Sequence, residues 1–309
     1  MINCIYVKKT MNNFYLVLIK KNGAIFHDFY ATSHDDLIHK FTTHYDNISR
    51  DYIKATFSPG LNHRLDDLAS YSIIFNQQYI PDWFNQQFKC QVYDDLINII
   101  SKMIISNDVD VILNEGIILT GNAKINNLKH SIVYAMYDNS CIKCLDYNTE
   151  VLYMGDNSII DEMCDNTKVI RADSFSKINN MYDYSKVIDL TGHASVGDMY
   201  QNSRISTIKF DANIDEMHND SSAYIIKHMG KVNEMHGFSV IEEIHDNTTV
   251  NKMFDNSRIN YMHGESKIIE MHDDSMIESM YGNSIVELSY ANSLVRKINE
   301  KAKILKKLL

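Results

Sequence analysis

The sequence predicts a mainly β protein, in which a small α+β domain is followed by a single-chain β-solenoid and a C-terminal capping helix. Three observations indicate this fold. A nine-residue pattern recurs without insertion from Met136 onward, both prolines and the one tryptophan precede it, and the last residues have helical spacing. We expect the α+β domain at residues 1–110, the solenoid at 111–297 and the helix at 298–309.

Three positions define the repeat. Counting from Met136 in steps of nine, eleven of the sixteen methionines occupy one slot, here called the anchor. Ser or Thr stands four residues later in 15 of 18 repeats, and Ile or Val stands six residues later in 17 of 18. Two buried side chains contribute about 3 to 6 kcal/mol, whereas ordering nine residues costs about 9 to 18 kcal/mol. A single unit is therefore unstable, and neighbouring units must stack as in a solenoid.

The repeat favours strands over helices, because a nine-residue step places successive anchors on opposite faces of an α-helix. Ser-x-Ile alternates as a strand does. The Asp-Asn or Gly-Asn before the serine, as at Asp255 and Gly282, is turn chemistry that tolerates left-handed backbone. Methionine recurs every eighteen residues from Met163 to Met271. We therefore expect two repeats per coil, about nine coils, and residue n stacked on residue n+18.

The spacing from Met through Ser to Ile resembles the hexapeptide-repeat pattern of β-helical proteins, in which aliphatic residues six apart flank a small residue. Here the next inward residue follows after three positions, as in Ile268-x-x-Met271, which suggests a cross-section with two long and two short sides. Residues 131–298 also resemble the nine-residue M-x-(D/G)-N-(S/A)-x-V repeats of uncharacterised phage and bacterial proteins. That resemblance implies the repeat architecture and carries no established activity.

The region before the repeats has different patterns. "FYLVLIKKNGAIFHDFY" places strand residues on both sides of Lys21-Asn22-Gly23, which predicts a hairpin. "SHDDLIHKFTTHY" begins with a Ser33 cap and an acidic first turn, which predicts a helix. A second helix is predicted over Val92 to Ile104, and residues 111–125 are expected to form an irregular first coil.

The C-terminal segment "NEKAKILKKLL" places Ala302, Leu305 and Leu309 on one helical stripe. The open end of a solenoid exposes a strand edge and core side chains, so we expect this helix to cover it. Two other interpretations are self-association, through this helix or through the N-terminal domain, and a weak contact with an anionic surface.

Outward side chains beside the anchors form the candidate binding surface. If residues 18 apart stack, the residue after each alternate anchor contributes to a column of rings that continues to Tyr290, and the residue before it contributes to a mainly acidic column. This arrangement can stabilise the coil edge by cross-strand pairing, bind a protein partner, or hold a divalent cation with imidazole and carboxylate ligands. Stabilisation explains the repetition most simply. The predicted partner-binding residues are Tyr182, Tyr200, His218, His236, Phe254, His272, Glu216, Glu234 and Glu270.

Two other groups contain metal-ligating residue types. Cys141-x-x-Cys144 is half of a zinc site and lacks a second pair. A cluster on the first predicted helix could bind a metal with His63 or Asp66 as further ligands, but nothing in the spacing requires this, and a capped, solvated helix explains the cluster more simply. No P-loop, dinucleotide fingerprint, nucleophile elbow or HExxH motif occurs, so we predict no catalytic residue, metal or cofactor. The clustered helix residues are His34, Asp35, Asp36, His39 and His44.

The net charge of −10 belongs to the repeats: residues 133–298 contain 14 Lys/Arg against 26 Asp/Glu. Such a surface repels nucleic acid and anionic membrane and favours basic partners or cations. No apolar run is long enough to span a membrane, and the N-terminal residues have no signal-peptide pattern. Five cysteines without disulfide spacing fit a reducing compartment. We therefore expect a cytoplasmic protein, in the host cytoplasm if a phage encodes it.

Three classes of function fit these patterns. We expect a non-enzymatic binding or scaffold protein whose partner has a basic surface. The phage resemblance implies a sharper form, an inhibitor that occupies the basic nucleic-acid-binding site of a host protein. One alternative is an acyltransferase resembling the hexapeptide enzymes, although the repeats lack the pocket-forming loops that such enzymes carry. The other is an extracellular fibre or adhesin segment, which the free cysteines and oxidisable methionines disfavour.

Overall fold

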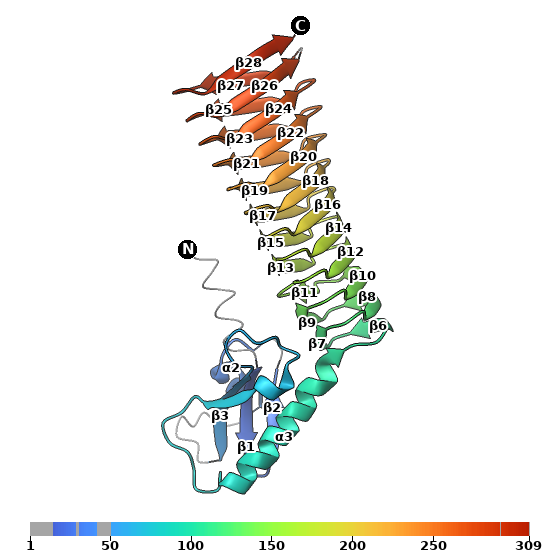
Figure 1. The fold of residues 1–309 in the computed structure, drawn as a ribbon. Coiled ribbons are helices and arrows are strands. Elements are labelled where there is room, and N and C mark those ends of the chain that lie inside the picture. Colours follow the sequence, from blue (N-terminus) through green and yellow to red (C-terminus); the bar gives the residue numbers. More distant parts are fainter. Residues whose placement is uncertain (1–14, 29–30, 42–50, 291, 309) are drawn as a thin grey trace. The chain divides into compact units, whose positions relative to one another are not determined.

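The structure is a computed structural model that describes residues 15–28, 31–41, 51–290 and 292–308. It is mainly β, with a solenoid of about 11 turns, each of about 18 residues, and a small N-terminal α+β region (Figure 1). The chain divides into two compact units, residues 1–105 and residues 106–309.

An antiparallel sheet is the centre of the N-terminal unit. Its strand order is β2-β1-β3-β4. The predicted hairpin is confirmed, because β1 and β2 pair antiparallel on either side of the turn and Gly23 in that turn has φ of 86°. The strands are β1 (Tyr15–Lys20), β2 (Ile25–His27), β3 (Tyr52–Ser58) and β4 (Ser72–Phe75).

Helix α2 (His34–Phe41) confirms the first predicted helix over the residues that the structure describes. The Asp36 N–H donates to Ser33 Oγ at 3.1 Å, and the Ser33 N–H donates to Asp36 Oδ2 at 2.9 Å. This reciprocal pair satisfies two backbone donors at the start of the helix. Leu37 and Ile38 are buried against Leu18 and Tyr52, which fixes α2 on the sheet.

Helix α3 (Gln86–Met103) confirms the second predicted helix and begins earlier than expected. Asn85 Oδ1 accepts the Phe88 N–H at 2.9 Å and caps the first turn, upstream of the start that the apolar spacing predicts. The short elements η1 (Leu68–Ser70) and β5 (Ile104–Ile105) precede and follow α3. None of the helices in the described part of the chain is long and apolar enough to cross a membrane.

Two parallel sheets form the solenoid, with alternate strands in alternate sheets (Figure 1). The even-numbered strands are β6 (Val109–Leu113), β8 (Lys124–Lys129), β10 (Cys141–Asp146), β12 (Ile159–Met163), β14 (Lys177–Met181), β16 (Ser195–Met199), β18 (Asn213–Met217), β20 (Lys231–Met235), β22 (Thr249–Met253), β24 (Lys267–Met271), β26 (Ile285–Tyr290) and β28 (Lys303–Leu308). The odd-numbered strands are β7 (Gly116–Leu119), β9 (Ile132–Met136), β11 (Glu150–Val151), β13 (Lys168–Ala172), β15 (Lys186–Leu190), β17 (Arg204–Ile208), β19 (Ser222–Ile226), β21 (Val240–Ile244), β23 (Arg258–Met262), β25 (Met276–Met280) and β27 (Leu294–Ile298).

The strand register confirms two repeats per coil. Met217 lies beside Met235, and every pair of neighbouring strands from β10 and β9 onward has partners 18 residues apart. Nearer the start the register is irregular: Val109 pairs with Ile125, and β7 and β9 pair with a bulge. The irregular first coil predicted at residues 111–125 is therefore confirmed. The solenoid has more turns than the nine expected. Coils also form before Met136 and after Lys297, outside the eighteen repeats from which nine coils were expected.

From β12 to β25, the core consists of the second and fifth residues of each five-residue strand. In β14 these are Ile178 and Met181, both fully buried. Inward residues of a straight strand are two apart, so a separation of three requires a bend, and the ladder skips the third residue of the strand. The small residue four after each anchor is also buried, as Ser203 and Ser221 show.

Left-handed backbone recurs at the corner two residues after each anchor from Met136 to Met280. Asp138 has φ of 57° and Asp255 of 54°, and Gly237 takes the same place with φ of 64°. Asp, Asn and Gly tolerate this conformation better than other residues. The turn chemistry expected from the sequence is therefore confirmed.

The predicted C-terminal helix is wrong. Residues 303–308 form β28, which pairs parallel with β26 and places Ile304 beside Val286 in the 18-residue register. Ala302 is buried at the position of the small residue, so the repeat continues through the segment. The preceding coil supplies hydrogen-bond partners for a strand here, whereas a helix this short is marginal in water. The C-terminal helix that was considered above as a route to self-association is therefore not formed, since residues 303–308 are a strand.

Candidate partner-binding surface

The predicted ring residues form one continuous stack along the sheet of even-numbered strands. Neighbouring ring centroids lie 4.4 to 5.2 Å apart, and neighbouring ring planes are inclined by 7° to 16°. Because the rings cover one another's faces, the stack presents mainly ring edges to a partner. We call this stack the ring column: Tyr182, Tyr200, His218, His236, Phe254, His272 and Tyr290.

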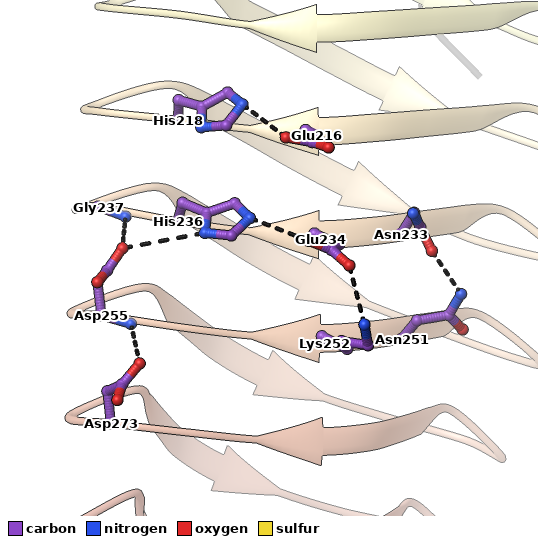
Figure 2. A network of polar contacts seen from close by, with 10 residues as sticks. All are labelled: Glu216, His218, Asn233, Glu234, His236, Gly237, Asn251, Lys252, Asp255 and Asp273. Atoms are coloured by element: carbon purple, nitrogen blue, oxygen red, sulfur yellow. Dashed lines mark hydrogen bonds and ion pairs between the residues drawn. The ribbon is translucent and has the colours of Figure 1, made fainter.

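A second column lies beside the rings. Its members are the fourth residues of the even-numbered strands from β12 to β24, and the buried methionine that follows each of them faces inward, so the residues on both sides of that methionine face outward. Figure 2 shows the pairing of the two columns: His218 Nε2 lies 3.0 Å from Glu216, and His236 Nε2 lies 3.2 Å from Glu234. We call this set the acidic column: Glu162, Asn180, Asp198, Glu216, Glu234, Lys252 and Glu270.

Contacts between coils shift the pKa values of residues in the acidic and ring columns. Lys252 Nζ donates to Glu234 Oε1 at 3.1 Å, from one coil to the next (Figure 2). This hydrogen bond, with a smaller contribution from His236, lowers the pKa of Glu234, and the same contact raises the pKa of Lys252. Desolvation, followed by Asp198, raises the pKa of Tyr200. The columns therefore combine neutral phenols with charged carboxylates.

All the predicted partner-binding residues lie together in these two columns. His272 Nε2 lies 2.9 Å from Glu270, so the "EMH" triplets share one geometry. The "EIH" triplet repeats it on the other sheet, with His245 Nε2 2.8 Å from Glu243. These contacts support the stabilising role considered above, because they join neighbouring residues and neighbouring coils. Both oxygens of Glu234 are engaged, so among the described residues of the two columns the ring edges and the second carboxylate oxygens of Glu216 and Glu270 remain to meet a partner.

A ladder of corner carboxylates was not anticipated from the sequence. The Gly237 N–H donates to Asp255 Oδ2 at 2.9 Å, and the Asp255 N–H donates to Asp273 Oδ2 at 3.1 Å (Figure 2). Asp138 and Asp156 make the same contact at 3.0 Å. A neutral N–H does not compensate the carboxylate charge, so these residues support the corners and also keep the surface acidic.

Two groups of potential metal ligands occur in these columns within the described part of the chain: Cys144 with Glu162 and Cys164, and Asp198 with Glu216 and His218. Sequence reasoning missed the first group and considered the second only in general, as imidazoles beside carboxylates; each follows from the 18-residue coil as residues n, n+18 and n+20. The Cys141-x-x-Cys144 motif does not form the first group, since Cys141 Sγ instead lies 4.0 Å from Asp161 Oδ2.

The histidines and carboxylates near α2 have separate structural roles. Burial lowers the pKa of His34, whose Nε2 contacts a backbone oxygen of β3. Among the described residues this set forms no group able to hold a metal, and His44 lies outside them. The contacts are Asp35 with Lys54, Asp36 with Thr32 and Ser33, His34 with Ala55, His63 with Asp67, and Asp66 with Arg64.

The ring and acidic columns repeat an aromatic ring beside a polar or charged side chain from coil to coil. Such repetition suits a binding surface, since a reaction requires one place that differs from its neighbours. Comparison of the chain with protein-family models, curated proteins and solved structures finds no match.

Proposed function

We propose that the protein is a non-enzymatic scaffold whose solenoid presents the ring and acidic columns to a protein partner with a basic surface. The observation that carries this proposal is the continuous stack of seven rings from Tyr182 to Tyr290, with carboxylates beside it. Aromatic residues are enriched at protein interfaces, and fixed rings lose little conformational freedom on binding.

The charge of the solenoid supports a basic partner. Residues 133–298 have 26 acidic and 14 basic side chains, an excess of 12 negative charges. Glu216 keeps 41% of its side-chain surface exposed beside His218, so a guanidinium or ammonium group can reach its carboxylate. A field of one sign along a rigid surface accelerates association with an oppositely charged partner.

The unbroken stacking of coils supports a scaffold over an acyltransferase. From β10 to β26 each strand of the even-numbered sheet pairs in the 18-residue register, without an inserted loop that would shape a substrate pocket. The resemblance to phage repeats adds a sharper form of the proposal, in which the acidic solenoid occupies the nucleic-acid-binding site of a host protein.

Affinity capture from a cell extract with two matched triple variants tests the proposal. The column variant is Glu216→Gln, Glu234→Gln and Glu270→Gln, and the control is Asp211→Asn, Asp220→Asn and Glu265→Gln. Each removes three negative charges, and the control residues are exposed outside both columns. We expect the control and the parent protein to retain a common basic partner that the column variant loses.

Salt provides the second measurement. The Debye length shortens from about 10 Å at 0.1 M to about 3 Å at 1 M ionic strength, so capture should weaken steeply as salt is raised. Equal loss of the partner by both triple variants would show that net charge, and not the columns, is recognised. Absence of any salt-sensitive basic partner would contradict the proposal itself.

A further inference from the structure

The residue types at the two column positions change near the start of the solenoid, where each position is taken by a cysteine. Cys144 occupies the acidic-column position one coil before Glu162, and Cys164 occupies the ring-column position one coil before Tyr182. The Sγ atoms of both cysteines and a carboxylate oxygen of Glu162 all lie within 4.8 Å of one another. This part of the solenoid therefore carries different side chains at these positions from the coils that follow it.

The three ligand atoms suit a tetrahedral metal ion. With Zn–S distances of about 2.3 Å and Zn–O distances of about 2.0 to 2.2 Å, tetrahedral ligands lie about 3.5 to 3.8 Å apart. Approach by about 1 Å, within the range of side-chain rotation, would bring the present atoms to that spacing. Cys144 and Cys164 are half-buried and Glu162 is exposed, so an ion can enter from solvent.

Neighbouring carboxylates increase the attraction for a cation. Asp146 and Asp183 both act electrostatically on Cys164. Lys129 also acts on Cys144, and its Nζ lies 3.6 Å from Asp146 Oδ2. Because unlike charges attract more strongly at a half-buried site than in bulk water, the local field favours a divalent cation.

We propose that Cys144, Glu162 and Cys164 form a binding site for a thiophilic divalent cation, with Zn²⁺ as the ion that the ligand set fits best. Thiolate ligands select zinc over magnesium or calcium, and a site with three protein ligands leaves a fourth position for water. On binding, each thiol releases its proton to solvent, so the two charges of the ion replace two protons.

Two other assignments fit less well. Asp198, Glu216 and His218 also come within 4.8 Å of one another, but this group lacks sulfur and His218 is engaged with Glu216 and with the ring stack. A disulfide between Cys144 and Cys164 would need no carboxylate. The effect of replacing Glu162 on metal affinity therefore distinguishes a metal site from a disulfide-forming pair of cysteines.

Titration of the reduced full-length protein with Co²⁺ tests the site, since tetrahedral thiolate-bound cobalt absorbs visible and near-ultraviolet light. A Cys4→Ser background removes the one thiol that the structure does not describe. We expect one equivalent of Co²⁺ to bind with thiolate charge-transfer bands, and Zn²⁺ to displace it and to raise the melting temperature. Cys144→Ser and Cys164→Ser should each weaken binding by more than the roughly 10- to 100-fold that loss of an outer-shell partner causes.

Matched variants complete the test. Cys90→Ser and Cys141→Ser should leave the bands and the Zn²⁺-dependent rise in melting temperature unchanged, whereas Glu162→Gln should keep the bands and weaken binding. Absence of thiolate bands in the parent protein would overturn the proposal, as would bands and affinity that are undiminished in Cys164→Ser or bands that disappear in Cys141→Ser. Unchanged affinity in Glu162→Gln would remove the carboxylate from the site and overturn the three-ligand assignment.

Discussion

Asp255 allows the two roles of a corner residue to be measured separately. Its backbone is left-handed, with φ of 54°, and its Oδ2 accepts the Gly237 N–H of the preceding coil at 2.9 Å. Asparagine keeps both properties, glycine keeps only the tolerance of left-handed backbone, and alanine keeps neither. Three substitutions at this one position therefore separate the acceptor from the backbone conformation.

The expected losses follow from these contacts. An exposed intramolecular hydrogen bond contributes about 0.5 to 1.5 kcal/mol, and left-handed backbone costs a residue with a β-carbon about 1 to 2 kcal/mol. Asp255→Asn should therefore change the free energy of unfolding by less than about 0.5 kcal/mol, since surface replacements that preserve contacts are nearly neutral. Asp255→Gly should lose about 1 kcal/mol, and Asp255→Ala about 1.5 to 3.5 kcal/mol.

Urea denaturation followed by circular dichroism measures these differences, and hydrogen exchange at the Gly237 amide reports the same corner locally. Local readout matters because repeat proteins can open one end before the other. Equal stability of the Ala and Gly variants would show that left-handed strain is unimportant here. Equal stability of the Gly and Asn variants would show that the carboxylate acceptor contributes nothing to coil stacking.

Three further changes test the core, the small-residue column and the pH response. Met217→Ala should lower the free energy of unfolding by about 2 to 5 kcal/mol, because Met217 is fully buried between coils and truncation leaves a cavity; urea denaturation measures this. Ser221→Ala should be nearly neutral, since no partner is found for its buried hydroxyl among the described residues, whereas Thr248→Ala should lose about 1 kcal/mol with the bond to the His245 carbonyl. Desolvation and then His245 lower the pKa of His263 in the folded protein. As pH falls, the unfolded chain, with a histidine pKa of about 6.5, therefore takes up a proton at a higher pH than the folded protein does. The stability that neutral His263 contributes is then lost as pH falls below that value. His263→Phe keeps the ring and should lose less stability between pH 7 and 5 than the parent protein, which urea titrations at each pH would show.

The sequence was sufficient for the arrangement of the coils from Met136 onward, up to the C-terminal segment, because the repeat has no insertions. Once Met163 and Met181 are placed in one column, every inward residue of the following coils is determined, and the structure buries these residues from β12 to β26, whereas Val295 is half-buried and Ile298 is exposed in β27. The ring column follows from the same step, since Tyr200 and His218 can only stack if residue n lies on n+18. Side-chain pairs within one strand, such as Glu234 with His236, are equally readable from their two-residue spacing.

The contacts that the sequence reading missed join residues whose spacing is not a simple multiple of the repeat or whose partner is backbone. Cys144 and Cys164 are 20 residues apart, so the local CxxC pattern drew attention to the wrong pair. The bond from the Gly237 N–H to Asp255 involves no side chain on the donor coil and leaves no signal in the donor sequence. Such contacts require coordinates, or the explicit search of positions n+18 and n+20.

The C-terminal error shows how context decides between two valid local patterns. Residues 298–309 satisfy a helical stripe, but Ile298, Ala302 and Ile304 also fill the anchor, small and aliphatic slots of another repeat. A helix of this length must form its own nucleus, whereas a strand is added to a ladder that β26 already presents. Each residue added to that ladder gains a partner at once, so the strand is favoured wherever the slots are filled correctly. Lys303, Lys306 and Lys307 lie along the same strand, and charged side chains of this kind discourage further pairing at a sheet edge.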